Sequence, residues 1–425
     1  MVASRLSVES DLLWTRTTPL LDEETIERMI AESLESMPVS GQRVLVIVPD
    51  LTRTMPLPFF FRLIVQHLRP RVHALDFLVA LGTHPSLDEN ALNRLFGVTP
   101  RERASSYSDI RLINHAWKTP EALVSLGAIP AHEIAHLSHG LLEISVPVRI
   151  NRLVLEYDHL LVCGPVFPHE VAGFSGGNKY FFPGISGPDV IDATHWLGAL
   201  MTSNTIIGAK DTPVRQVINR AASLIPRPKH AFCCVVSTVG VHGVFFGDPV
   251  TAFDQAADLS AKVHIRTVER PYKRVLSLLP EMYDDMWVGA IGMYKVEPVV
   301  ADGGEVIVYS PHISELSWSH GKLIREVGYH IRDYFLSQWG QYKEYPWGIL
   351  AHSTHLKGSG AYSHGVEQPR ITVTLATGVP ETICRDVNLD YCDPRMIDVA
   401  SWLHAQDDEL LVVPHAGEML YRLKP

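Results

Sequence analysis

The feature that most constrains the fold of this chain is an alternation of short apolar runs, polar loops and helical patterns. Residues 43–48 and 73–81 are two such runs, and each is followed by a loop and then by residues with helical periodicity. Asp50 and His84 come directly after these two runs. The alternation predicts a parallel α/β sheet, in which ligands gather at the carboxyl ends of the strands.

The same reasoning predicts the other elements. We expect helices over 22–36, 59–68, 251–262 and 322–338 and another that begins at Ser86, and strands over 43–48, 73–81, 160–164, 231–236, 241–246, 305–309, 370–375 and 409–413. A chain of 425 residues is long for a single core, so we expect two α/β domains, over 1–270 and 271–425. Residues 263–300 are expected to form the crossover between them, and the last residues are free to pack back on the first domain.

Charge and composition exclude several classes of protein. The net charge is −10 and no basic run occurs, which argues against a nucleic-acid surface. Five cysteines without a Cys-x-x-Cys pair indicate neither a disulfide framework nor a zinc site, and we expect them to be reduced. No apolar stretch approaches the roughly 18 residues of a membrane helix. We therefore expect a cytoplasmic protein that binds neither nucleic acid nor membrane, with its oligomeric state left open.

One segment, residues 168–195, gathers the residue types of a binding site. It contains, in order, His169, Ser175, Gly176, Gly177, Lys179 and His195. The backbone N–H groups of residues 175–178 can form a concavity for an anion, and Lys179 can reach a phosphate or act as an amine nucleophile. Each residue taken singly has an ordinary alternative, because the spacing is not that of a Walker A loop and a lone histidine is more often a core or surface residue.

Two further pairs are candidates for substrate chemistry. Asp50 and Arg53 form either a loop-stabilising ion pair or a clamp, in which Arg53 binds a substrate carboxylate and Asp50 a sugar hydroxyl. His84 and His169 either stabilise their loops or serve as general acid and base, because the pKa of an imidazole is about 6.5. Two histidines on opposite sides of one substrate are what a racemase needs.

Metal ligands are scarce in the sequence. His195 has no second ligand at a metal-binding spacing, so a metal at this position would have to arrive inside an organic cofactor. Four later histidines, His312, His352, His355 and His364, fall in stretches rich in glycine and serine. Polar loop residues are the favoured interpretation of these four, ahead of a second metal site.

Together these pieces resemble the nickel-pincer nucleotide-dependent lactate racemase (LarA) family. The resemblance rests on Asp50-x-x-Arg53, Gly82-x-His84, Pro168-His169, Gly173-x-Ser175-Gly176-Gly177-x-Lys179, Pro183-Gly184 and His195. It covers nearly the whole chain and is clearest over residues 43–200. It implies two α/β domains with the active site in the cleft between them.

The resemblance also implies roles for these residues. Lys179 would attach the cofactor, a pyridinium mononucleotide with sulfur and carbon donors to nickel, and His195 would be the protein's ligand to nickel. The other cofactor contacts would be Asp50, Thr52, Ser175, Gly176 and Gly177. Arg53 would hold the substrate carboxylate, with His84 and His169 as the acid–base pair. The implied reaction is racemisation or epimerisation of a 2-hydroxy acid by hydride transfer, with cofactor-biosynthesis enzymes as partners.

The chain departs from the family near the substrate. Trp287-Val288-Gly289-Ala290-Ile291 stands where the family has Tyr-Gln-x-x-Lys, so Ile291 replaces a substrate-binding lysine unless the nearby Lys295 takes its place. We expect Trp287, Ile291 and Lys295 near a 2-hydroxy acid that is larger than lactate or carries more hydroxyls. Two alternatives stay open: a nicotinamide-type 2-hydroxyacid oxidoreductase, although Gly-x-Gly-x-x-Gly is missing after the first strand, and a nucleotide-binding or sensor homologue without catalysis.

Overall fold

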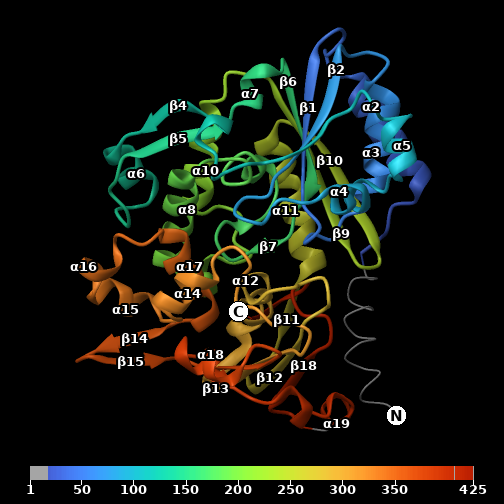
Figure 1. Cartoon of the computed structure of the whole chain (residues 1–425). Helices are drawn as coiled ribbons and strands as arrows, with labels where there is room; N and C mark the ends of the chain where they lie inside the picture. The colour runs from blue at the N-terminus through green and yellow to red at the C-terminus, as the bar shows by residue number, and fades with distance from the viewer. Residues whose placement is uncertain (1–17, 406, 425) are drawn as a thin grey trace.

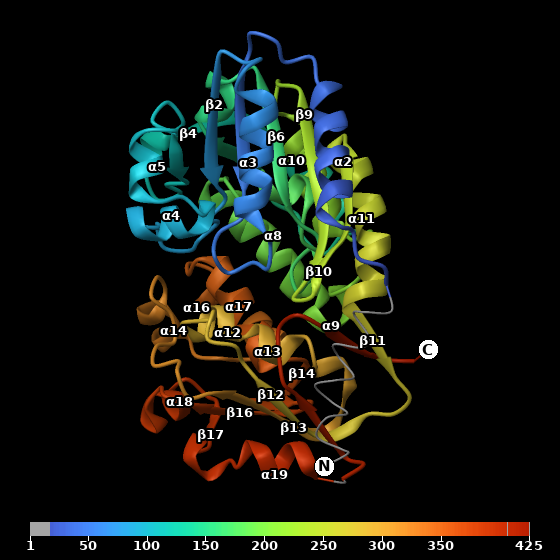
Figure 2. The ribbon, with the colours of Figure 1, turned by 90° about the vertical axis from the view of Figure 1, so that its right-hand side faces the viewer.

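The computed structural model describes residues 18–405 and 407–424. These residues form two main β-sheets with helices packed around them, and one sheet lies above the other (Figure 1, Figure 2). The N-terminal sheet has the strand order β10-β9-β6-β1-β2-β3, and the C-terminal sheet has the order β17-β16-β13-β12-β18. Every neighbouring pair is parallel except β9 and β10. The predicted α/β architecture with parallel sheets is confirmed.

The N-terminal sheet is buried on both faces. Its strands are β1 (Arg43–Val48), β2 (Ala74–Val79), β3 (Leu112–Asn114), β6 (His159–Pro165), β9 (Lys229–Ser237) and β10 (Gly240–Gly247). Helices α2 (Glu23–Glu35), α3 (Leu57–Leu68) and α4 (Glu89–Phe96) cover one face, and α8 (Pro188–Met201), α10 (Pro213–Ser223) and α11 (Pro249–His264) pack on the other. Because strand side chains alternate, Leu45 and Ile47 enter one core while Val44 and Val46 enter the other.

The C-terminal part holds the smaller sheet and a group of short helices. The strands of this sheet are β12 (Tyr272–Leu278), β13 (Val300–Ser310), β16 (Thr372–Thr377), β17 (Asp390–Tyr391) and β18 (Leu410–Val413). Two further pairs of strands lie outside it: β11 (Ile265–Val268) with β19 (Leu420–Leu423), and β14 (Gly360–Ser363) with β15 (Val366–Pro369). The helices of the C-terminal part include α12 (Met286–Gly289), α13 (Ile291–Tyr294), α14 (Gly321–Val327), α15 (Arg332–Ser337), α16 (Trp339–Tyr342) and α17 (Trp347–Lys357). One hydrophobic core runs through both parts, from Val162 on β6 to Val306 on β13.

Two expected helices differ from those observed. The helix expected at Ser86 begins at Glu89, because the side chain of Asp88 accepts a hydrogen bond from the backbone N–H of Ala91 and caps it. The helix expected over 322–338 is observed as two helices: α14 ends at Val327, next to Gly328, and α15 begins at Arg332. That glycine has a φ of 74° with a ψ of −179°, a backbone conformation that favours glycine and cannot continue a helix.

The expected crossover over 263–300 contains two strands. β11 and β12 lie within it, and β12 is a central strand of the C-terminal sheet. β12 carries charged side chains at Lys273 and Arg274, which interrupt the apolar pattern that would have marked it. The final strand, β19, was also not expected; it pairs in parallel with β11.

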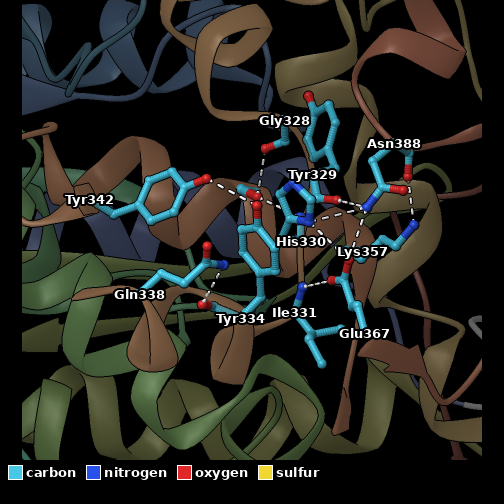
Figure 3. A network of polar contacts seen from close by, with 11 residues as sticks. Gly328, Tyr329, His330, Ile331, Tyr334, Gln338, Tyr342, Lys357, Glu367 and Asn388 are labelled. Atoms are coloured by element: carbon cyan, nitrogen blue, oxygen red, sulfur yellow. Dashed lines mark hydrogen bonds and ion pairs between the residues drawn. The ribbon is translucent and has the colours of Figure 1, made fainter. Parts of the chain in front are cut away.

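A polar network anchors α17 to the loop that separates α14 from α15 (Figure 3). The hydroxyl of Ser353 on α17 donates to the carbonyl of Gly328 and accepts from the N–H of His330. His330 is stacked on Tyr334 at 3.7 Å and bonded to Glu367 at 2.8 Å. The loop between α14 and α15 is thereby hydrogen-bonded to α17 at Gly328 and at His330, and these bonds hold α17 in place.

The two parts of the chain meet along α8 and along the last strand. α17 lies directly below α8 in both views (Figure 1, Figure 2), and the two helices are in contact. Arg422 on β19 donates to the carbonyls of Asn204 and Ile207, so the end of the chain returns to the N-terminal part. The boundary placed near residue 270 stays a prediction.

No helix within residues 18–405 and 407–424 combines the length and the apolar character needed to cross a membrane.

Candidate active site

A cavity with an empty volume of about 920 Å³, including its opening to solvent, lies between the two parts of the chain. Its N-terminal wall includes Asp50, Arg53, His84, His169, Glu170, Ser175, Lys179 and His195, and its C-terminal wall includes Trp287, Tyr294, His352 and His355. The structure therefore brings into one cavity both predicted acid–base histidines, the predicted carboxylate-binding arginine, the predicted attachment lysine and the predicted metal ligand.

The order of the strands explains this convergence. β6, β1 and β2 are adjacent and parallel, so their carboxyl ends meet at one edge of the sheet. Asp50 and Arg53 follow β1, His84 follows β2, and His169 and Lys179 follow β6. His195 arrives separately, on α8.

The side chain of Asp50 is bonded to the ring of His84. Its Oδ2 lies 2.5 Å from Nδ1 of His84, and its Oδ1 accepts hydrogen bonds from the N–H and the hydroxyl of Thr52. Burial works to raise the pKa of Asp50, but His84, Arg53 and Thr52 together hold that pKa well below its usual range. The carboxylate is therefore ionised, Nδ1 of His84 carries a proton, and Nε2 has a free lone pair when the ring is neutral.

His169 has two different partners at Nδ1. The backbone N–H of Val171 donates to this atom at 3.1 Å, and Oε2 of Glu170 also lies 3.1 Å from it. An amide can only donate and a carboxylate can only accept, so the two contacts suit the two possible proton positions on Nδ1. Burial, together with the positive charges of Lys179 and Arg53, lowers the pKa of His169 well below its usual value, so the resting ring is neutral.

Lys179 lies in the cavity as a weakly basic amine. Burial, reinforced by the nearby charge of Arg53, lowers its pKa to about 7. A substantial fraction of the amine is therefore uncharged at neutral pH, which is the nucleophilic form. Arg53 is half-buried, and its guanidinium lies 5.5 Å from the ring centroid of Phe167.

His195 presents one ring nitrogen for coordination. Its Nδ1 is 2.7 Å from the carbonyl of Ile191, one helical turn back on α8, so Nδ1 carries the proton and Nε2 keeps its lone pair. Burial lowers the pKa of His195 to about 4, which keeps the ring neutral. A neutral imidazole held by a backbone carbonyl is the usual form of a metal-binding histidine.

Five predicted site residues lie outside this cavity: Thr52, Gly176, Gly177, Ile291 and Lys295. Thr52, Ile291 and Lys295 line a neighbouring cavity, with an empty volume of about 630 Å³, that shares Arg53 with the first. The amine of Lys295 donates to the carbonyls of Gly417 and Glu418.

The two glycines are packed against protein. A Cβ on Gly176 would lie 2.4 Å from Cγ2 of Val166, and one on Gly177 would lie 2.7 Å from the carbonyl oxygen of Pro249. Both have positive φ values, 94° and 57°. These positions are glycine because of conformation and close packing behind Lys179, whereas the sequence argument placed them against a phosphate.

Four residues of the cavity were missed or misplaced by the sequence analysis. His352 and His355 were taken for loop residues, but both are buried on α17, and Trp287 is stacked on His352 with centroids 4.0 Å apart. Glu170 and Tyr294 were not singled out. Glu170 directly follows His169, which is the signal that could have identified it. His312 and His364 lie outside helices and away from the cavity.

No group of three or more His, Cys, Asp or Glu side chains in the described part of the chain could hold a metal ion. A metal near His195 would therefore need donors from another molecule. The residues around His195 fit a cofactor that brings its own metal, because the weakly basic amine of Lys179 and the free Nε2 of His195 line the same cavity.

Comparisons with known proteins agree with this geometry. Residues 19–208 match the lactate racemase N-terminal domain family. Lactate racemases from Thermoanaerobacterium thermosaccharolyticum and Lactiplantibacillus plantarum are 26% identical over 181 residues and 27% identical over 184 residues. Each alignment covers 41% of this chain, and the chain spans only 38% and 39% of the length of these two relatives.

Two solved structures resemble the whole chain. A crystal structure of a Thermotoga maritima protein is 31% identical, with a TM-score of 0.87, and the match covers 95% of this chain and 99% of that one. The lactate racemase apoprotein from T. thermosaccharolyticum has a TM-score of 0.69 at 17% identity over 93% of this chain and 92% of that one, which shows a shared fold. Residues 19–208 therefore form a domain of the lactate racemase N-terminal domain family, within a chain that shares the fold of the lactate racemase apoprotein.

Proposed function

We propose that this protein is a racemase or epimerase of a 2-hydroxy acid that works with a nickel-pincer nucleotide joined to Lys179. The observation that carries the proposal is the convergence of His84, His169, Arg53 and Lys179 in one cavity, with His195 on its wall. A nucleotide-binding homologue without catalysis has no need for two histidines whose ring protons are each controlled by a carboxylate.

The residues fit the cofactor at two atoms. Nζ of Lys179 would form the covalent link, and Nε2 of His195 would be the ligand that the protein gives to nickel. When bound, the group supplies a reversible acceptor for the hydride at C2 of the substrate. Loading requires enzymes that make the cofactor, and we propose these as partners.

Arg53 is the group that binds the substrate carboxylate. Its planar fork suits a carboxylate, and its position among Asp50, Phe167 and Lys179 holds it at the floor of the cavity. Among the described residues that line the cavity, Arg53 and Lys179 are the cations other than histidine. Once Lys179 is joined to the cofactor, one fixed cation remains for one carboxylate.

His84 acts as a base through Nε2. As the C2–H bond breaks and its electron pair leaves as hydride, the 2-hydroxyl proton passes to Nε2 and the C–O bond becomes a carbonyl. The resulting imidazolium is stabilised by the ionised Asp50 on the other side of the ring.

His169 performs the same work on the opposite enantiomer. As a base, His169 carries its proton on Nδ1, where it bonds to Glu170, and offers a lone pair at Nε2. As an acid it is the imidazolium, whose Nδ1–H still bonds to Glu170 and whose Nε2–H donates to the carbonyl oxygen. Hydride return to the other face of the planar 2-oxo acid, with a proton from the histidine on that side, gives the inverted product. Glu170 accepts from Nδ1–H in both the neutral and the protonated form of the ring, so His169 can serve in either direction of the reaction.

The first experiment separates this function from its alternatives. The chain is expressed with the cofactor-biosynthesis enzymes, and intact mass, nickel content and loss of optical activity of 2-hydroxy acids are measured. We expect an adduct on Lys179, stoichiometric nickel and racemisation, and we expect Lys179→Arg to lose all three. An adduct and nickel without turnover of any 2-hydroxy acid would favour a sensor homologue, and NAD-dependent oxidation would favour an oxidoreductase.

A further inference from the structure

A second cavity adjoins the active site. It has an empty volume of about 1210 Å³, and His84 and Trp287 line both cavities. We call it the outer pocket and define it by the side chains used below: Asp88, Glu281, Asp284, Asp285, Trp287 and His320. A substrate whose 2-hydroxyl contacts His84 and whose chain passes Trp287 therefore extends into this space.

Three neutral rings meet at the boundary between the outer pocket and the active site. Trp287 lies between His320 and His352, with centroid distances of 4.5 Å and 4.0 Å. Burial lowers the pKa of His320 to about 4, and it lowers the pKa of His352 well below its usual value. These rings form a neutral and largely apolar surface at that boundary, against which the C–H groups of a hydroxylated chain pack.

His320 carries a polar atom without a partner. The residue is 8% exposed, it lines the outer pocket, and its Nε2 is buried without a hydrogen bond to any described residue. Buried polar atoms are nearly always paired, so this one marks a place for a ligand group. A hydroxyl both donates and accepts, so it can bond to Nε2 whether or not that nitrogen carries the ring proton.

The acidic side chains of the outer pocket determine which substituents on C2 of the substrate, here called the tail, can bind there. Asp88, Glu281, Asp284 and Asp285 line it together with Asp50 of the active site, and Arg94 is the lysine- or arginine-type side chain among its described residues. A second carboxylate on the substrate would be repelled, whereas hydroxyls can donate hydrogen bonds to these oxygens. Glu281 and Asp284 are exposed, so their carboxylates are open to such contacts.

We propose that the outer pocket binds the hydroxylated tail of the substrate, and that the chain acts on polyhydroxy 2-hydroxy acids of the aldonic type in preference to alkyl or dicarboxylic ones. This inference rests on the proposed function and adds the substrate class to it. Trp287 packs against the tail, His320 bonds to one of its hydroxyls, and the four carboxylates exclude an acidic tail.

The test compares lactate, malate, threonate and ribonate with the cofactor-loaded enzyme. We expect kcat/KM to rise from lactate to threonate to ribonate and to be lowest for malate. His320→Phe keeps a ring against Trp287 but removes Nε2, so the ratio of kcat/KM for ribonate to that for lactate should fall about five- to tenfold. His73→Phe, on an exposed loop away from both cavities, is the matched control and should leave the ratio unchanged.

Two further measurements complete the test. The double variant Glu281→Gln, Asp284→Asn should raise kcat/KM for malate several-fold, and calorimetry on the chain without cofactor should show that ribonate binds more tightly than malate. Racemisation of lactate with no preference for ribonate, and no effect of His320→Phe on the ratio, would overturn the outer-pocket inference alone. A chain that carries the adduct and nickel but turns over none of the four acids would overturn the proposed function itself.

Discussion

At the scale of single residues, the site depends on which nitrogen of each ring carries a proton. Asp50 holds a proton on Nδ1 of His84, and the carbonyl of Ile191 does the same for His195. His169 has both a donor and an acceptor at Nδ1. Three imidazoles of similar intrinsic chemistry thereby receive different roles from their neighbours.

Asp50→Asn tests the first of these arrangements. An amide cannot stabilise the imidazolium of His84 as a carboxylate does, so we expect kcat to fall between about 10² and 10⁴-fold with little loss of folding stability. Polarimetry gives the rate, and thermal unfolding gives the stability. Thr52→Val is the control, because it removes a hydrogen bond to Asp50 while the contact with His84 remains, and its effect should be much smaller. Full activity in Asp50→Asn would remove Asp50 from the mechanism.

Lys179 should titrate near neutral pH. Its pKa is lowered to about 7 by burial, so the reactive amine appears as the pH rises through that value. Competitive acylation of the chain without cofactor, read by mass spectrometry from pH 5 to pH 10, should show a midpoint close to pH 7 for this lysine. Surface amines in the same sample are the reference, and a midpoint shared with them would contradict the lowered pKa.

At the scale of elements, α8 and α17 form the joint that completes the cavity. α8 carries His195, and α17 carries His352 and His355. Oδ1 of Asp192 on α8 accepts the N–H of Gly348 in the first turn of α17 at 2.8 Å. Trp196 on α8 is stacked on Trp339 of α16 at 5.1 Å, and Trp339 in turn contacts Trp347, the first residue of α17, at 5.4 Å, so an aromatic contact through α16 supports the polar one.

Asp192→Asn should change how stability depends on pH. Burial raises the pKa of Asp192 to about 6, above the value of about 3.8 in the unfolded chain, so the folded state binds more protons between these pH values. This group therefore makes the wild type less stable as the pH rises from about 4 to about 6. Asn keeps the accepting oxygen without the charge, so that part of the decline should disappear from thermal unfolding measured across this range.

Asp189→Asn is the matched control for that variant. Asp189 lies on the same helix and forms a half-exposed ion pair with Arg149 at 2.5 Å. Its replacement removes one negative charge from α8 and leaves the contact with Gly348 in place. Because burial contributes more than Asp189 to the raised pKa of Asp192, the pH profile of this control should change only slightly. An unchanged pH profile in Asp192→Asn, or the same change in both variants, would show that Asp192 is not the responsible group.

At the scale of the whole molecule, the end of the chain ties the two parts together. β19 pairs with β11, and Arg422 donates to the carbonyls of Asn204 and Ile207. Lys295 bonds to the carbonyls of the loop just before β19. The final residues thus close the region behind Arg53, although they lie far from it in sequence.

Arg422→Ala should weaken the attachment of β19 to the N-terminal part of the chain and lower the free energy of unfolding. It leaves two carbonyls without their donor, at a cost of about 1–3 kcal/mol in the free energy of unfolding, and it should lower the urea midpoint and speed proteolysis near β11. Lys424→Ala is the control, because its ion pair with Glu269 is exposed and such pairs contribute about 0–1 kcal/mol. Equal effects of the two variants would mean that the buried contacts of Arg422 do not hold the end of the chain.

Local sequence identified every strand of the N-terminal sheet except the short edge strand β3, and it identified most residues of the candidate site. Apolar runs of β-branched residues identified β1, β2 and β6, and the rule that ligands gather at the ends of parallel strands placed Asp50, His84 and His169 together before any coordinates were known. The α/β class followed from the same pattern. These conclusions depend on periodicity within a few residues, which a sequence displays directly.

Tertiary structure alone decided the features that depend on distant segments. α17 has an apolar sequence interrupted by His352 and His355, and only its packing on α8 shows that these rings face the cavity. β12 became a central strand because β13 and β18 pair with it on either side, despite its charged start. The proton on His169 depends on Val171 and Glu170 folding back on its ring. Contacts between elements are set by how whole surfaces pack, and no local pattern in the chain records that.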